Sequence, residues 1–375
     1  MDSRGVNVLP MIGFIILILV LFTGFMLFGK DDYNMEHNTY IQEKKTSISE
    51  NFGGYTVDEN GELSTQGCDK ISVNAAATGI NIYTHNQDSV KARLYGEVNT
   101  SNKDAVPYLE LEEDGQTAVI RVKYPQVVQH NFSADLTLDV TIPEAWLNKL
   151  DIVTVSGDIS APDLSGTDIY LKSSSGNIKI HGITGRSIKT ETISGKTEIG
   201  VLNGESGFFK SSSGDIIIDK AVFSDNIDAN TISGKYRIDR IECTEADFRS
   251  SSGDIVIKDI FSESFKSETI SGKITLKMKN GSAELKTTSG NISAEFEESF
   301  DRIKAISISG DVSLTLPHDS QFNLDVKTVS GDIKCNDFPV NISSSNGRQL
   351  AGKVGNGSGE VRINTTSGNV TVRNQ

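Results

Sequence analysis

The sequence predicts an all-β protein whose main part is a β-solenoid, a single-stranded β-helix with coils of about 19 residues. A Ser-Gly pair recurs along the second half of the chain at nearly constant spacing, and the residues before each pair alternate between apolar and polar. The 34 glycines and an aromatic content of only 7% favour turns and strands over packed helices. We expect a right-handed solenoid, preceded by a small β lead-in region and one N-terminal transmembrane helix.

The N-terminus reads as a short tail, residues 1–7, followed by a transmembrane anchor, residues 8–29. The anchor carries no charge over 22 residues, which at about 1.5 Å per residue spans a hydrocarbon layer of about 30 Å. A cleavable signal peptide would have a shorter apolar run ending at small residues, whereas this run ends Phe25-Met26-Leu27-Phe28-Gly29-Lys30. Lys and Arg counts do not settle the orientation. The short tail and the β-rich bulk favour a single-pass protein of the cell membrane with its C-terminal domain extracytoplasmic.

Two regions separate the anchor from the repeats. Residues 30–68 are polar without a sustained period, which predicts a juxtamembrane stalk. Residues 69–149 read as a β lead-in or cap. There, Asp114-Gly115 joins two alternating runs, 109–111 and 119–122, which is a β-hairpin signal. The run 136–143 is a further strand that ends at Pro143.

The solenoid itself is predicted over residues 150–375. A single repeat is too small to bury its own apolar face, so the coils must stack. Most glycines of the Ser-Gly pairs are 18–21 residues apart, and the 37-residue gap before the last pair contains Asn346-Gly347 as a candidate degenerate repeat. The glycines are Gly157, Gly176, Gly195, Gly214, Gly234, Gly253, Gly272, Gly290, Gly310, Gly331 and Gly368.

Alignment on the glycine predicts which side chains face inward. The positions seven and five before it are apolar, as at Ile188 and Phe248, with polar residues between them. Ser or Thr stands three positions before every glycine, and Ser immediately before it. Strand alternation places both hydroxyls on the inward face, where they can bond to the backbone of a neighbouring coil. Glycine then allows the bend.

A second periodicity bears on the coil length. Copies ending Ser-Gly-Lys alternate with copies ending Ser-Gly-Asp or Ser-Gly-Asn, so one coil holds either 19 or 38 residues. Coils of 38 residues would stack Lys196, Lys235 and Lys273 on one another at about 4.8 Å, which is unfavourable. Coils of 19 residues alternate lysine with Asp or Asn along the corner, and we prefer them.

The lead-in and the repeats together resemble a known family. The strand ending Ile142-Pro143, followed by Thr154-Val155-Ser156-Gly157-Asp158-Ile159, is similar to the bacterial "putative adhesin" domain of unknown function, and residues 357–370 repeat the pattern. The resemblance covers about 69–375. It implies a β-helix domain in an envelope or surface protein, with some relatives membrane-anchored and associated with envelope stress. It implies no catalytic residues.

We therefore expect a non-catalytic, membrane-anchored solenoid for adhesion, cell-envelope scaffolding or envelope-stress signalling. The expected partners are the membrane, through the N-terminal helix, and a cell-envelope polymer or envelope protein. A net charge of −14 argues against nucleic acid. The alternative is a carbohydrate-active enzyme, a polysaccharide lyase or hydrolase, which needs clustered carboxylates in a groove. The recurring corner acids occur as repeat residues rather than as a cluster. They are Asp158, Asp215, Asp254, Asp311 and Asp332.

No cofactor or metal is expected. The cysteines Cys68, Cys243 and Cys335 lie far apart without metal or redox spacing. Calcium at the corner acids is disfavoured because lysine takes the same position in alternate coils.

The one candidate binding surface is a stripe of isoleucines two positions before the glycine, whose parity is outward. The competing interpretation is that the corner rotates them inward or that neighbouring side chains cover them. They are Ile193, Ile232, Ile270 and Ile308.

Overall fold

The computed structural model describes residues 41–48 (backbone only), 54–126 and 132–375. The chain divides into two units, Met1–Thr39 and Tyr40–Gln375, and every described residue belongs to the second. Within the described ranges, no helix is long and apolar enough to cross a membrane. The anchor expected at residues 8–29, and the first part of the expected stalk, lie outside those ranges.

The described residues form one hydrogen-bonded sheet of 25 strands, which confirms the all-β prediction. At the N-terminal end of the sheet, four antiparallel strands pair in series, and the last of them pairs in parallel with a strand of the first coil. A separate hairpin turns at Asp114-Gly115, as predicted. A short 3-10 helix, Lys103–Ala105, precedes the hairpin. The antiparallel strands are β1 (Ile41–Ile48), β2 (Gly54–Ser64), β5 (Ser89–Asn99) and β8 (Ser133–Pro143), and the hairpin is β6 (Tyr108–Asp114) with β7 (Thr117–Lys123).

The first coil of the solenoid has no Ser-Gly pair. It consists of β3 (Lys70–Asn74) and β4 (Gly79–His85), which pair in parallel with the strands of the next coil. Its corner runs Ala75-Ala76-Ala77-Thr78, and the carbonyl of Ala76 accepts hydrogen bonds from Val155 and Ser156. Residues 86–148 are therefore an insertion between the first coil and the second.

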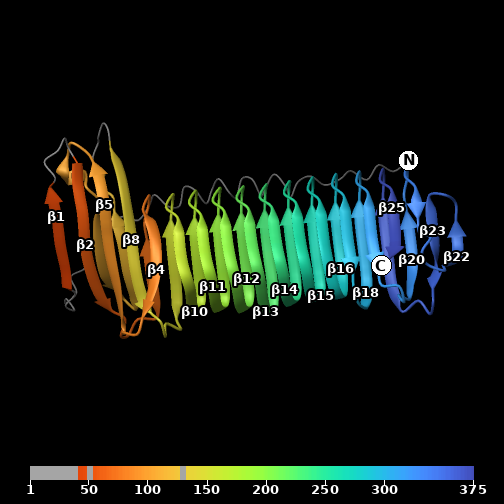
Figure 1. Ribbon diagram of the computed structural model, residues 1–375, viewed down its shortest axis with the longest axis horizontal. Coiled ribbons are helices and arrows are strands. Elements are labelled where there is room, and N and C mark those ends of the chain that lie inside the picture. Colours follow the sequence, from red (N-terminus) through yellow and green to blue (C-terminus); the bar gives the residue numbers. More distant parts are fainter. Residues whose placement is uncertain (1–40, 49–53, 127–131) are drawn as a thin grey trace. The chain divides into compact units, whose positions relative to one another are not determined.

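The regular coils follow with a register of 19 residues. Ile159 pairs with Ile178, and Ile178 pairs with Thr197. The 19-residue coil is thus confirmed, and the 38-residue alternative is wrong. Figure 1 shows these long strands stacked side by side, each bending once between successive corners. They are β10 (Ile159–Ser173), β11 (Ile178–Thr192), β12 (Thr197–Ser211), β13 (Ile216–Thr231), β14 (Tyr236–Ser250), β15 (Ile255–Thr269) and β16 (Ile274–Thr287), and the short strand β9 (Lys149–Thr154) precedes them.

The core follows the predicted alternation. The apolar positions seven and five before each glycine are buried, including Ile188, Phe248 and Phe265. Aromatic rings contact one another inside the solenoid. Phe248 stacks on Phe265 at 5.8 Å and meets Tyr236 edge to face at 5.4 Å, measured between ring centroids. Because each coil contributes only a few apolar groups, this burial depends on the neighbouring coils.

The inward hydroxyl three positions before the glycine joins two coils. Thr269 Oγ1 accepts a hydrogen bond from the amide of Gly272 at 3.1 Å and donates to the carbonyl of Gly253, in the preceding coil, at 3.5 Å. This confirms the predicted bond between the hydroxyl and a neighbouring coil. Because the same pair of bonds recurs at other corners, it fixes the spacing and register of the stack.

The repeat glycines are required for a different reason from the one expected. None of them has a positive φ. Instead, a Cβ built on Gly253 would lie 1.8 Å from the carbonyl oxygen of Gly234, and the other corners are equally tight. Glycine is thus needed because the backbones of stacked corners approach too closely for any side chain.

The last coil in the sequence is not the last in the stack. Strands β24 (Gly359–Thr365) and β25 (Val370–Asn374) lie between the coil of β18 (Phe300–Ser307) and β19 (Val312–Leu316) and the coil of β20 (Phe322–Lys327) and β21 (Ile333–Lys334). The short strand β17 (Ile292–Phe296) precedes this region and pairs with β19. The C-terminal coil is therefore inserted between two coils that precede it in the chain.

An antiparallel hairpin follows β20 in the stack. Strands β22 (Asn341–Ser345) and β23 (Gln349–Val354) form it, and β23 pairs with β20. Gly347, with φ of 78°, lies in the turn of the hairpin. Asn346-Gly347 is thus a hairpin turn and not the degenerate repeat that its position suggested.

Candidate functional site: the Ser-Gly edge

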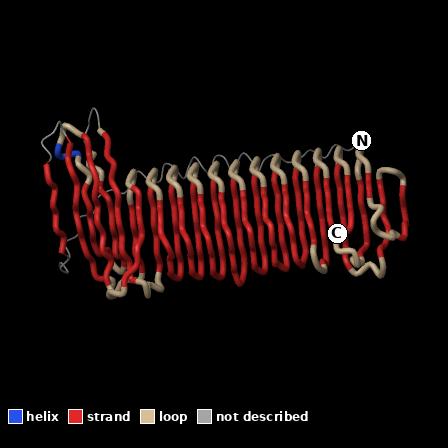
Figure 2. Tube along the Cα trace, in the orientation of Figure 1, coloured by secondary structure: helices blue, strands red, loops and turns tan. Residues whose placement is uncertain are grey.

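The Ser-Gly corners of eleven coils lie side by side along one edge of the solenoid, which we call the Ser-Gly edge (tan turns between the red strands of Figure 2). Backbone hydrogen bonds link each corner to the next, and the inserted C-terminal coil takes its place in the series. The edge presents three columns of side chains. They occupy the positions two before, one before and one after the glycine.

The column two before the glycine contains the predicted stripe. Ile193, Ile232 and Ile270 are half-buried, and Ile308 is 49% exposed. Ser or Thr occupies the same position in every coil between them, so apolar and hydroxyl side chains alternate along the whole edge. In stacking order the column reads Val155, Ser174, Ile193, Ser212, Ile232, Ser251, Ile270, Thr288, Ile308, Thr366 and Val329.

The stripe predicted from the sequence did not include the two valines at the ends of this column. Val155 is 44% exposed and Val329 is 59% exposed. Their position relative to the glycine was a sufficient signal. The alternation through Thr366 and Val329 was not visible, because it depends on the insertion of the C-terminal coil.

The column immediately before the glycine consists only of serines, and all of them are exposed. The prediction that they face inward is wrong. Strands end at the buried hydroxyl, as β15 does at Thr269, so the residues that follow lie in a bend where strand alternation no longer applies. Side-chain hydrogen bonds are formed by Ser156 and Ser330. The other nine serines form none within the described structure, so packing does not explain why serine recurs there.

The column after the glycine carries Asp, Asn or Lys, and its acids have a structural role. Asp254 Oδ1 accepts a hydrogen bond from the backbone amide of Lys273 in the next coil at 2.9 Å, and Asp215 accepts one from Lys235 at the same distance. Lysine cannot accept such a bond. The corner acids thus serve as turn and stacking residues, in keeping with the preference of Asp and Asn for turns.

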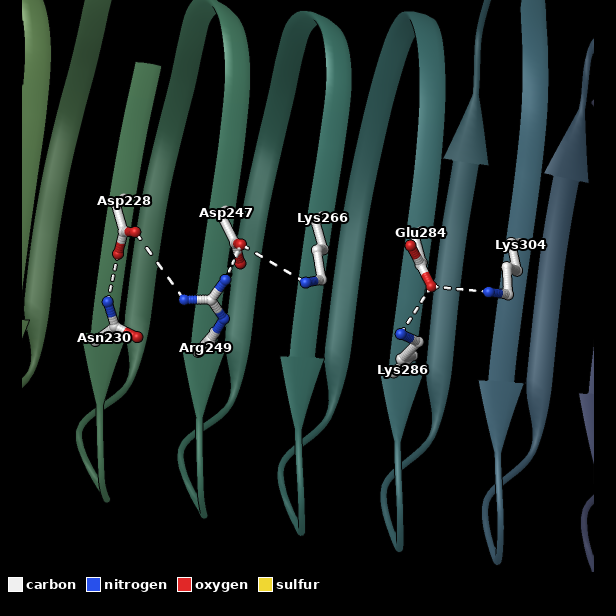
Figure 3. Close-up of polar contacts among 8 residues, drawn as sticks. All are labelled: Asp228, Asn230, Asp247, Arg249, Lys266, Glu284, Lys286 and Lys304. Carbon is white, nitrogen blue, oxygen red and sulfur yellow. Dashed lines mark hydrogen bonds and ion pairs between the residues drawn. The ribbon is translucent and has the colours of Figure 1, made fainter. Parts of the chain in front are cut away.

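A second set of charges lies on the outer face of the strands rather than on the Ser-Gly edge (Figure 3). Lys286 and Lys304 lie 2.7 and 2.9 Å from Oε1 of Glu284. Hydrogen bonds from Lys286 and then Lys304 lower the pKa of Glu284 to about 2. At Asp247, burial raises the pKa despite the neighbouring Arg249 and Lys266. Lys304 and Lys266 reach their acids across adjacent strands, whereas Lys286 and Arg249 lie on the same strand as theirs. The cross-strand pairs mainly report the register of the sheet.

We expect Glu284→Gln to lower stability by less than about 1 kcal/mol at pH 7, because the ion pairs are partly exposed. The folded-state pKa of Glu284 lies below its unfolded value, so its stabilisation is present above about pH 4.3 and is lost as the pH falls through about 2. Urea unfolding of both chains between pH 7 and pH 2.5 measures the difference. A difference that does not shrink in acid would contradict the assignment.

Clustered acids occur near the inserted coil, where three short loops gather. A pocket of about 470 Å³ is lined by Glu297, Glu298 and Asp319, among others. A neighbouring pocket of about 540 Å³ contains Arg302 and Glu360, which form an ion pair at 2.9 Å. Glu297 is itself paired with Lys277 and Lys279.

The cysteines and acids offer no metal site within the described ranges. There, no group of three or more His, Cys, Asp or Glu side chains is placed to hold an ion. The three cysteines are unpaired, and burial raises the pKa of Cys243 and of Cys335 to about 11. Their thiols are therefore almost fully protonated at neutral pH and react slowly with electrophiles.

The fold is that of a β-solenoid domain, and its exposed, repeated serine side chains lie along one edge. The chain belongs to the Toastrack DUF4097 family, whose model matches residues 68–206 and 208–373. Two crystal structures from Parabacteroides distasonis are similar at low identity. A "putative adhesin" is 16% identical over 68% of this chain and 95% of that chain, with a TM-score of 0.40. A "putative lipid binding protein" is 17% identical over 69% and 96%, with a TM-score of 0.41. A search of curated proteins found no match.

Proposed function

We propose that this protein is a non-catalytic binding solenoid of the cell envelope, anchored in the cell membrane by residues 8–29 and acting in adhesion or scaffolding through the Ser-Gly edge. The support for the anchor and the extracytoplasmic placement is the 22-residue uncharged segment and the short tail before it. A signalling role in envelope stress would use the same edge as its sensor surface.

The observation that carries the proposal is the column of exposed serines. The hydroxyls three positions before the glycines, the corner glycines themselves and the acids Asp158, Asp215, Asp254 and Asp311 are explained by a bond or a close approach within the stack. The exposed serines and the alternating apolar column are not explained in this way. They present the same groups at intervals of about 4.8 Å, which suits a multivalent partner whose weak contacts add through effective concentration.

A carbohydrate-active enzyme is the second candidate, because Glu298 and Asp319 line one pocket. Glycosidases use two carboxylates on opposite sides of the scissile bond. Binding by the edge is favoured because its chemistry recurs in every coil, whereas this pocket lies at one irregular site. Loss of polysaccharide turnover in Glu298→Gln or Asp319→Asn, with the fold intact, would favour the enzyme.

The binding proposal is tested with Ser213→Cys, labelled on intact cells with a membrane-impermeant maleimide that carries a photocrosslinker. Ser213 is an exposed serine in the middle of the edge. We expect labelling without permeabilisation, followed by a defined crosslinked product on illumination. The matched control is Glu205→Cys, which is exposed at the opposite, return side of the same coil and should be labelled without giving that product.

The native chain supplies the second control, because its raised thiol pKa values at Cys243 and Cys335 should keep its own labelling slow. Protection of Ser213→Cys from the reagent until the membrane is opened would overturn the extracytoplasmic placement. Equal crosslinking from both sides of the coil would overturn the assignment of the edge.

A further inference from the structure

Side-chain size alternates along the Ser-Gly edge. Large side chains (Ile or Val) and small ones (Ser or Thr) alternate coil by coil, so the apolar column is a row of projections with gaps of the same period. Projections recur every second coil, at about 9.6 Å. A second copy of the same row, displaced by one coil, places each projection opposite a gap.

The charged column has the same two-coil period in the middle of the edge. The coils of Ile193, Ile232 and Ile270 carry Lys196, Lys235 and Lys273, whereas the coils between them carry Asp or Asn and the coil of Ile308 carries Asp311. The displacement by one coil that fits projections to gaps therefore also sets each lysine against an Asp or Asn. An undisplaced arrangement would set lysine against lysine and isoleucine against isoleucine.

The order of the columns across the edge selects the direction of pairing. A two-fold axis along the stacking direction gives a parallel pair, but it opposes the apolar column of one copy to the charged column of the other. A two-fold axis across the edge gives an antiparallel pair and opposes each column to itself. Only the antiparallel pair therefore uses both complementarities. Both arrangements are isologous, because each has a two-fold axis.

We propose, resting on the function proposed above, that the partner at the Ser-Gly edge is a second copy of this chain in antiparallel orientation. The register with the best match centres the two-fold axis between the corners of Ile232 and Ser251. In that register Lys235 faces Asp254 of the second copy, and Lys273 faces Asp215 of the second copy. No like charges face each other in any of the ten overlapping coils.

The size of the contact predicts its strength. Ten coils span about 45 Å and the three columns about 10 Å, so each copy contributes about 450 Å² and the pair about 900 Å². Interfaces of this size are weak and reversible. Antiparallel pairing also places the first coils (β3 and β4) of the two copies at opposite ends of the pair. Copies anchored in two apposed membranes then pair across the gap, and many such contacts give homophilic adhesion by multivalency.

The orientation is tested with the full chain in detergent micelles and two single variants, Ser175→Cys and Ser309→Cys. In the antiparallel register the corner of residue 175 faces the corner of residue 309. We expect a disulfide-linked dimer when the two variants are mixed under mild oxidation, and none from either variant alone. Dimers from each variant alone would show a parallel pair and overturn the proposal.

The fit of projections into gaps is tested by sedimentation of the double variant Ser212→Ile/Ser251→Ile. The edge of this variant is more apolar, so nonspecific hydrophobic association would make dimerisation stronger. If the pairing depends on gaps that accept the isoleucines, filling the gaps should instead weaken dimerisation at least tenfold. The exchange variant Ser212→Ile/Ile270→Ser should restore it, because position 212 of one copy faces position 270 of the other. A chain that stays monomeric at millimolar concentration, while Ser213→Cys still gives its crosslinked product in cells, would overturn self-pairing and leave the binding function standing.

Discussion

Replacing Phe248 with aspartate should lower the free energy of unfolding by about 4 kcal/mol or more. Phe248 is fully buried between the rings of Tyr236 and Phe265, in adjacent coils. The substitution removes these contacts, leaves a cavity and buries a carboxylate among apolar side chains. Because coils are stabilised mainly by their neighbours, the loss should extend beyond one coil. Urea denaturation followed by far-UV circular dichroism measures it.

Phe208→Asp is the matched control. Phe208 points outward from a regular strand and is 40% exposed. Its neighbours across the sheet are Lys189 on one side and Asp228 on the other, so attraction and repulsion of the new carboxylate largely offset each other. The substitution should therefore change stability by less than about 1 kcal/mol. Comparable losses for the two variants would contradict the assignment of inward and outward positions.

The coil length and the core could be predicted because both depend on patterns that every copy repeats. The unfavourable stacking of Lys196, Lys235 and Lys273 argued against long coils, and strand alternation identified inward positions such as Phe248. Alternation failed at the exposed serines for a local reason. The strand ends two residues earlier, at the buried hydroxyl, so the serine lies in a bend where side chains no longer alternate between the two faces.

The order of the last coils could not be predicted from the repeats. Similar coils with parallel strands stack almost equally well in any order, so β24 can pair with β18 or with β20, and here it pairs with both. The first coil could not be predicted because it lacks the repeat sequence. Its corner at Ala76 receives the same hydrogen bonds as a Ser-Gly corner without having its sequence. The candidate edge was therefore predicted at its isoleucines but not at its serines or at its full length.

Replacing the corner glycine Gly253 with alanine should lower the free energy of unfolding by about 3 kcal/mol or more, although it adds a single methyl group. That group would lie 1.8 Å from the carbonyl oxygen and 2.6 Å from the carbonyl carbon of Gly234. Both atoms belong to the backbone of the stacked corner, so the two coils must separate locally and stretch the hydrogen bond from the amide of Ser252 to the carbonyl of Ile232. Overpacking of this kind usually costs about 1–3 kcal/mol where side chains can adjust, and more where they cannot.

Gly79→Ala separates this effect from the general cost of removing a glycine. Gly79 follows the corner of the first coil, has no positive φ, and has no atom within 4 Å of the position that a Cβ would take. Its replacement should change stability by less than about 1 kcal/mol, and alanine restricts the unfolded chain equally in both variants. Thermal unfolding of the two variants under one condition gives the comparison. If Gly253→Ala were as mild as Gly79→Ala, close approach of the coils would not be the reason for glycine at the corners. The conformation of the bend itself would then have to explain the glycines.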